Sequence, residues 1–197
     1  AGGLNERNVS DWFDHLRRAV DTLPGLQLWG DIETFEIKNW ESVTLDRVTS
    51  RMERLSPFAD AFISFSYSHY YSPYEKNPGY HTTYLDYLKN GSLENEAPEI
   101  PCDISAELSE SSVTLKWKAS YDNIGVHSYD IYRNGIKIDS RIISKEMNEN
   151  LIDKLPQYIT FTDKFYPANE VIQYNVEAID FAGNRSGLSL PTFIRIH

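Results

Sequence analysis

Hydrophobic positions in the first half of the chain alternate between a helical and a strand-like period. The expected elements are a helix over residues 10–24, a strand over 26–33, a helix over 44–57, a strand over 61–71 and a helix over 80–88. Ser10 is the expected N-cap of the first helix. Because a helix joins the two strands, this order predicts parallel strands in a layered α/β or barrel domain.

The second half of the chain changes to the two-residue period of half-buried strands. Val113, Leu115 and Trp117 alternate with polar residues, and two further strands meet at Asn134-Gly135, a strong hairpin signal. Six or seven short strands within 100 residues predict an all-β sandwich of immunoglobulin type.

The two halves meet in a stretch rich in Pro, Gly and Glu over residues 90–101, which predicts a solvated linker. The predicted domains are therefore 1–97, α/β, and 98–197, all-β. Two strands alone cannot form a barrel, which needs about 250 residues. The first region thus looks like the end of a larger domain, with the missing N-terminal part elsewhere or replaced by self-association.

Charge and composition exclude several classes of function. The net charge is −10, with 9 basic and 15 acidic residues before position 98 and 10 and 14 after it, so neither half offers the basic patch that a nucleic acid needs. The chain has one cysteine and no apolar run long enough to span a membrane. Its isolated histidines predict no metal site, and no cofactor motif is present.

Candidate chemistry follows the first predicted strand, in the segment LWGDIETFE. Strand alternation places Trp29, Asp31 and Glu33 on one face, and Glu36 lies beyond the strand in the turn. In a barrel, catalytic groups lie at the carboxyl ends of strands, and glycoside hydrolysis uses two carboxylates. Asp31 and Glu33 are therefore the catalytic candidates. The alternative is a solvated strand end whose carboxylates pair with arginine, and this reading is favoured for Glu36.

Aromatic residues crowd the end of the second predicted strand. Tyr67, His69 and Tyr70, together with Trp29, are candidates for substrate binding, because aromatic rings stack on the apolar faces of sugars and tyrosine hydroxyls form hydrogen bonds. The alternative for Tyr67, His69 and Tyr70 is packing within the protein. For Tyr84 and Tyr87, packing is the favoured interpretation.

The segments "VTLKWKASYDNIGVHSYDIYRNGIKI" and "YNVEAIDFAGNRS" resemble bacterial fibronectin type III domains over nearly all of residues 98–197. The resemblance implies that Trp117 fills the space between two sheets and that Tyr174 pins a strand corner. Residues 140–157 look like an inserted loop. The domain is expected to be a structural spacer, with ligand or partner binding by its loops as the alternative.

Residues 10–90 resemble the last two βα units of a glycoside-hydrolase-like TIM-barrel family, known mainly as a bacterial domain of unknown function. The matching positions are Trp29, Asp31, Glu33 and Phe35 after the first strand, and Phe65, His69, Tyr70 and Pro73 after the second. In retaining barrel glycosidases the nucleophile lies on the seventh strand and the acid/base on the fourth. The resemblance thus implies Glu33 as nucleophile and an acid/base outside this chain, so the chain alone is expected to be inactive.

Together these patterns predict the C-terminal part of a secreted, periplasmic or cell-surface bacterial protein that binds or hydrolyses a carbohydrate. The alternative is a non-catalytic module that binds carbohydrate or docks a protein partner. A third possibility is a pure structural spacer, but a spacer role explains the tyrosine-rich segment poorly.

Overall fold

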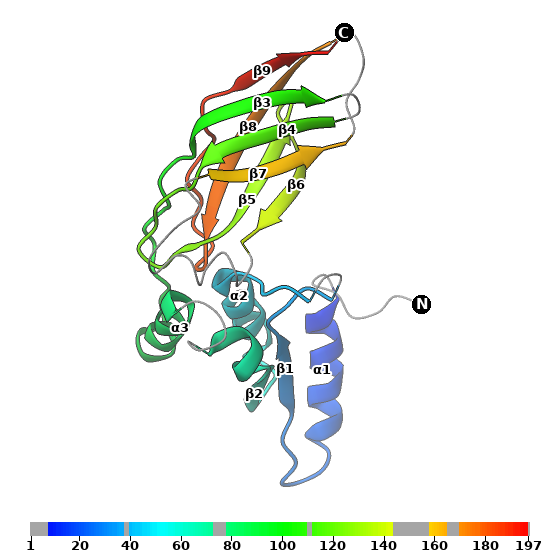
Figure 1. Cartoon of the computed structure of the whole chain (residues 1–197). Helices are drawn as coiled ribbons and strands as arrows, with labels where there is room; N and C mark the ends of the chain where they lie inside the picture. Colours follow the sequence, from blue (N-terminus) through cyan, green and yellow to red (C-terminus); the bar gives the residue numbers. More distant parts are fainter. Residues whose placement is uncertain are drawn as a thin grey trace. The chain divides into compact units, whose positions relative to one another are not determined.

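The computed structural model describes residues 8–37, 40–72, 78–109, 112–143, 158–164 and 170–196. Most of the insertion predicted at residues 140–157 lies outside this described part. The chain forms two compact units, one ending at Tyr70 and the other beginning at Tyr71 (Figure 1). Among the described residues, no helix is long and apolar enough to cross a membrane.

The first unit consists of two helices and a two-stranded sheet. Its elements are helix α1 (Val9–Val20), strand β1 (Trp29–Glu33), helix α2 (Leu45–Leu55) and strand β2 (Ala61–Phe65). The strands pair in parallel, with Trp29 opposite Ala61 and Glu33 opposite Phe65. The predicted order of elements and the parallel pairing are confirmed for this part of the chain.

Strand β1 has two different faces, because alternate side chains of a strand point to opposite sides. Gly30 and Ile32 are buried, whereas Trp29, Asp31 and Glu33 are exposed, as the alternation predicted. The glycine permits close packing, since a Cβ at position 30 would lie 3.0 Å from the ring of Phe62.

Helix α1 differs from its prediction at its start and on its apolar stripe. It begins at Val9 after Asn8, so Ser10 lies inside the helix and is not the N-cap. None of its residues is fully buried, and Leu16 is 42% exposed. The helix is held to the amino ends of the strands by Arg17, whose Nη1 lies 2.7 Å from Oδ2 of Asp60.

Strand β2 is shorter than predicted. It ends at Phe65, and residues Tyr67–Tyr71 form a π-helical turn. The reason lies in its neighbour: β1 ends at Glu33, so residues after Phe65 have no strand to pair with. The Thr34 hydroxyl instead donates to the Phe65 carbonyl oxygen over 2.6 Å.

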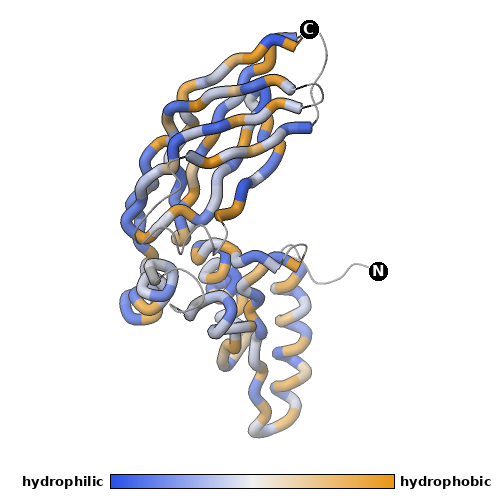
Figure 2. Tube along the Cα trace, in the orientation of Figure 1, coloured by the Kyte–Doolittle hydropathy of each residue, from blue (hydrophilic) through white to orange (hydrophobic). Residues whose placement is uncertain are grey.

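The second unit is mostly β-sheet. Its elements are helix α3 (Pro78–Asn90) and strands β3 (Cys102–Ser109), β4 (Ser112–Lys118), β5 (Val126–Arg133), β6 (Ile136–Ile142), β7 (Tyr158–Asp163), β8 (Val171–Asp180) and β9 (Thr192–Arg195). The strands form two antiparallel sheets with the orders β3-β4-β7 and β6-β5-β8-β9. Hydrophobic and polar residues alternate along these strands, as a sandwich requires (Figure 2).

The core of the sandwich lies between the two sheets and confirms the expected burial of Trp117, while the corner role of Tyr174 stays a prediction. Trp117 and Tyr174 are both fully buried. The Trp117 ring meets Tyr129 edge to face at 5.3 Å, and the Tyr174 hydroxyl donates to Asp163 over 2.8 Å. The predicted hairpin turn also forms, with positive φ at both Asn134 and Gly135.

The predicted solvated linker is instead attached to the sandwich. The backbone N–H of Glu99 donates to the Tyr121 carbonyl over 3.0 Å, and the side-chain amide of Asn184 donates to the Glu94 carbonyl over 3.2 Å. Pro98 and Pro101 are buried. Prolines and acidic residues predicted solvation, but backbone hydrogen bonds to the sandwich order this segment.

Helix α3 packs against the same end of the sandwich. Tyr80 is fully buried and its ring lies 5.2 Å from that of Phe181. Gly79 allows the helix to approach closely, because a Cβ there would lie 2.3 Å from the Ile124 carbonyl oxygen. Contacts therefore group α3 with the sandwich, while the domain boundary predicted near residue 97 stays a prediction.

Candidate functional site

The two predicted catalytic carboxylates lie on the exposed face of β1. Asp31 and Glu33 are two residues apart, so both side chains project from the same side of the strand. Glu33 is the last residue of the strand, at its carboxyl end. The structure thus places both groups where the prediction put them, but it does not test their catalytic role.

A cavity of about 470 Å³ in the first unit brings acids and arginines together. Its lining includes the carboxylates of Asp31, Glu33 and Glu36, the arginines Arg47, Arg51 and Arg54 of α2, and apolar residues of α1 and α2. Equal numbers of acidic and basic groups give the cavity no net formal charge. It can therefore hold a polar, uncharged ligand without a large electrostatic penalty.

The three acids differ in whether an arginine forms an ion pair with their carboxylate. Arg47 forms an ion pair with Glu36, which fits the structural role favoured for this residue in the turn. Arg51 donates to the backbone carbonyl of Glu33, so it fixes the strand end and leaves that residue's carboxylate available. Among the described residues, the structure shows no ion pair for Asp31 or Glu33.

Next to these acids, four aromatic rings form a cluster at the carboxyl ends of the two strands. Phe35 is buried, and its ring is nearly parallel to those of Trp40 (4.9 Å, 9°) and Tyr70 (5.4 Å, 13°). Phe65, the register partner of Glu33, meets Phe35 edge to face at 5.8 Å. The stack therefore lies at the same end of the sheet as Glu33.

The predicted substrate-binding residues have different environments. Trp29 is 55% and Tyr67 53% exposed. His69 is exposed, and its Nδ1 lies 2.9 Å from the Ser66 hydroxyl and 3.1 Å from that of Ser68. These two contacts orient the imidazole ring.

Tyr70 is largely buried, and its hydroxyl donates to the Trp40 carbonyl oxygen over 3.2 Å. Burial, with a smaller effect from the Glu41 carboxylate, raises the pKa of this tyrosine. The hydroxyl is thus a hydrogen-bond donor at neutral pH, and it supports the aromatic stack from within. Its predicted contact with a substrate stays a prediction.

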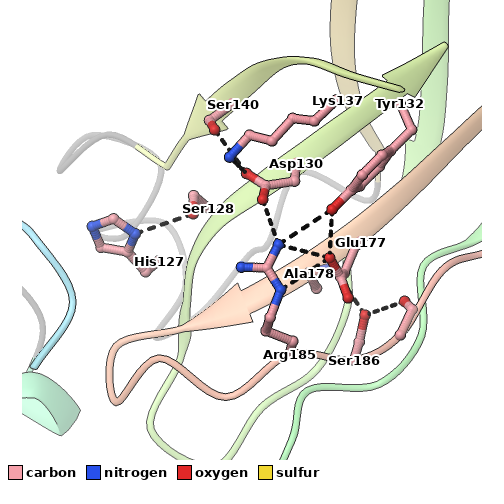
Figure 3. Close-up of polar contacts among 11 residues, drawn as sticks. His127, Ser128, Asp130, Tyr132, Lys137, Ser140, Glu177, Ala178, Arg185 and Ser186 are labelled. Carbon is pink, nitrogen blue, oxygen red and sulfur yellow. Dashed lines mark hydrogen bonds and ion pairs between the residues drawn. The ribbon is translucent and has the colours of Figure 1, made fainter. Parts of the chain in front are cut away.

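A second polar cluster, on the outer face of the four-stranded sheet, is structural in character. Asp130 of β5 is 1% exposed and binds Lys137 at 2.8 Å and Arg185 at 2.5 Å (Figure 3). Arg185 also contacts Glu177 of β8 at 2.7 Å. Burial raises the pKa of Asp130, but the bonds from Lys137, Ser140 and Arg185 outweigh it and lower that pKa. All these groups are satisfied by one another, so none is available for chemistry.

A third polar cluster lies in the turns at one end of the sandwich. The Asp180 carboxylate accepts from the backbone N–H groups of Gly183 (2.6 Å) and Asn184 (2.8 Å). Asp122 accepts from the N–H of Ile124 at 3.0 Å. In the described part of the chain, no group of three or more His, Cys, Asp or Glu residues could hold a metal ion.

Sequence reasoning missed two features of these sites. Trp40 was not singled out because it follows the strand in an irregular loop, although a tryptophan between polar residues is itself a signal. Arg185 was missed because its partners lie 8 and 55 positions away in the chain. Only the fold brings it to Asp130.

Comparison with known families and proteins finds one family model that matches the first part of the chain. Residues 1–77 match the model of a family described as a domain of unknown function, DUF4434. Those residues include β1, β2, Asp31, Glu33 and the aromatic stack.

Curated relatives match about half of the chain. It is 35% identical over 97 residues to an alpha-amylase of Niallia circulans, covering 49% of this chain and 6% of the relative. It is 31% identical over 93 residues to chitinase Chi52 of Paenibacillus xylanexedens (47% and 15%) and 32% identical over 96 residues to exoglucanase B of Cellulomonas fimi (47% and 7%). The chain thus spans only a small part of each relative's length. Since the first unit comprises only residues 1–70, each match includes residues of the second unit.

Among solved structures, a Fn3-like protein from Clostridium thermocellum aligns with 52% of this chain and 96% of its own length, at 22% identity and a TM-score of 0.38.

Proposed function

We propose that this chain is the C-terminal part of a larger carbohydrate-active bacterial protein. In this proposal, residues 1–97 supply the last βα units of a glycoside-hydrolase-like TIM barrel, and residues 98–197 form a fibronectin type III-like domain. The parallel pair β1–β2 joined by α2 supports the first assignment, because a barrel is built from such units. Three relatives bear the names of glycoside hydrolases, which supports a carbohydrate as the substrate of the larger protein.

Uncovered apolar surface in the first unit supports a missing part of the domain. Ile63 is 50% and Phe65 52% exposed on the β2 side, next to the exposed Trp29 and the acids of β1. On α1, Trp12 is 53% exposed. A folded domain seldom leaves so many large apolar side chains in water, so preceding strands and helices, or a second copy, would cover them.

The observation that carries the proposal is the exposed face of β1. It presents Asp31 and Glu33 at the carboxyl end of a parallel strand, beside stacked aromatic rings. In the proposed reaction, Glu33 acts as the nucleophile, with Asp31 as the second carboxylate of the same face. Hydrolysis with retention needs a nucleophile and a separate acid/base about 5 Å apart. The acid/base would come from a strand outside this chain.

Contacts with the substrate would come from rings around these acids. Trp29 and Tyr67 are exposed and offer apolar faces to sugar rings, and His69 offers a ring nitrogen for a hydrogen bond. Tyr70 is proposed as a further contact. An uncharged glycan also suits a cavity whose acids and arginines balance.

The test uses the complete gene product and its Glu33→Gln and Asp31→Asn variants, assayed for release of reducing ends from starch, chitin and cellulose. Glu33→Gln is expected to lower turnover at least about 1,000-fold without changing the thermal midpoint, since a neutral amide cannot form the covalent intermediate. Glu53→Gln, an exposed position on α2, makes the same change of charge and serves as the control. Full activity of Glu33→Gln would refute the nucleophile assignment.

A second candidate function is glycan binding without turnover. The exposed ring of Trp29 beside these acids favours it, because stacking on a sugar ring needs no second catalytic carboxylate. Binding of oligosaccharides by the complete gene product, with no hydrolysis by any variant or by the wild type, would support this function over the first.

The proposed location is outside the cytoplasm: secreted, periplasmic or on the cell surface. Polymeric glycans of the kind named for the relatives are too large to enter a cell, which supports this placement. Fractionation of the native cells with an antibody against this chain would test it, and recovery only from cytoplasm would contradict it.

A further inference from the structure

Trp40 combines an exposed ring with an unfavourable backbone. Its ring is 62% exposed although one face stacks on Phe35. Its φ angle is +60°, in the left-handed region that favours glycine and that bulky residues rarely adopt. A residue selected only for the turn would be glycine or asparagine. The presence of the largest side chain at this position indicates that the ring itself is required.

Three hydrogen bonds hold the Trp40 loop in place. The N–H of Trp40 donates to the Glu36 carbonyl over 2.8 Å, and the N–H of Glu36 donates to the Glu41 carbonyl over 2.9 Å. The Trp40 carbonyl accepts the Tyr70 hydroxyl. The N–H and the carbonyl group of Trp40 are therefore both held before any ligand arrives, which reduces the entropy lost on binding.

The stack of rings beneath Trp40 gives it a rigid support. Tyr70, Phe35 and Trp40 are nearly parallel, and the two inner rings are buried. Phe35 in turn contacts Phe65, whose backbone pairs with Glu33. A ligand on the outer part of the indole would therefore lie at the same end of the sheet as the Glu33 carboxylate.

We propose that Trp40 is the stacking platform for a pyranose ring, in a subsite next to the sugar that contacts Glu33. The axial C–H groups of a pyranose form an apolar face that matches the exposed indole. The identity of the ligand as a glycan rests on the function proposed above.

Covering the core explains only one face of the indole. That face stacks on Phe35, whereas Trp40 as a whole is 62% exposed, so most of its surface faces water and buries nothing. Trp40→Gly should therefore relieve the left-handed backbone while removing one stacking contact. These effects oppose each other, so the thermal midpoint is expected to stay within about 3 °C of wild type.

The experiment measures binding of cellohexaose, chitohexaose and maltohexaose to the complete gene product by calorimetry. One of the three is expected to bind the wild type, and Trp40→Gly is expected to weaken that binding at least about tenfold. Trp40→Phe keeps a ring in the stack and should lose less than Trp40→Gly. Tyr121→Ala, an aromatic residue of similar exposure in the turn between β4 and β5, is the control and should bind as the wild type does.

Three results would overturn the proposal: no binding of any of the three probes by the wild type, equal binding by Trp40→Gly, or an equal loss in Tyr121→Ala. Binding is measured separately from hydrolysis, so failure of the catalytic assignment can be distinguished. If Glu33→Gln remains active while Trp40→Gly loses binding, the platform stands and the nucleophile is wrong.

Discussion

Replacing Asp122 with asparagine is expected to stabilise the protein at neutral pH. Asp122 lies in the turn between β4 and β5, and one of its carboxylate oxygens is buried with no hydrogen-bond partner. The other oxygen accepts the N–H of Ile124. Burial, with the charges of Asp180 and Glu94 adding to it, raises the pKa of Asp122 to about 6. Asparagine keeps the acceptor and carries no charge.

The size of the effect follows from the pKa of Asp122 in the folded and unfolded states. The folded value of about 6 exceeds the reference value of 3.8, so the folded protein holds this proton to higher pH. The stability that this proton provides is complete below about pH 4 and is lost as the pH rises to about 6. At about 1.4 kcal/mol per pKa unit, removing this charge can raise the free energy of unfolding by at most about 3 kcal/mol. Partial exposure to solvent reduces the expected gain in Asp122→Asn to about 1–2 kcal/mol at pH 7.5.

The assay is urea unfolding of wild type and Asp122→Asn at pH 4.5 and pH 7.5, followed by the fluorescence of the buried Trp117 and by circular dichroism. The difference in unfolding free energy should be about 1–2 kcal/mol at pH 7.5 and much smaller at pH 4.5. Asp103→Asn, at an exposed position with positive φ that asparagine tolerates, is the control. A variant no more stable than wild type at pH 7.5, or a gain of equal size at both pH values, would refute the reasoning.

Two further predictions concern packing in the second unit. Arg185→Met removes a cation that contacts the buried Asp130, and it should lower the free energy of unfolding by about 2 kcal/mol. Lys137→Met, which leaves the arginine in place, should cost less, and the reverse order in urea unfolding would contradict this account. Gly79→Ala places a Cβ against the Ile124 carbonyl, so it should speed amide hydrogen exchange in α3 by at least about tenfold. Exchange at the wild-type rate would show that the helix is not held by this contact.

Local patterns in the sequence determined much of this protein. The alternation in β1, the parallel order of β1, α2 and β2, the hairpin at Asn134 and the burial of Trp117 all follow from the periodicity and turn chemistry of a few neighbouring residues. Such features are predictable because each depends on side chains close together in the chain.

Tertiary structure alone decided the remaining features. The residues after Phe65 formed a turn because β1 has ended, and residues 90–101, though rich in Pro and Glu, are bound by Tyr121 and Asn184 of the sandwich. The same holds for the site. Sequence placed Asp31 and Glu33 on one face, but the stacking of Trp40 on Phe35 and Tyr70 needs a loop and a turn 30 residues apart. Contacts between distant segments depend on the packing of the whole unit, which no local pattern encodes.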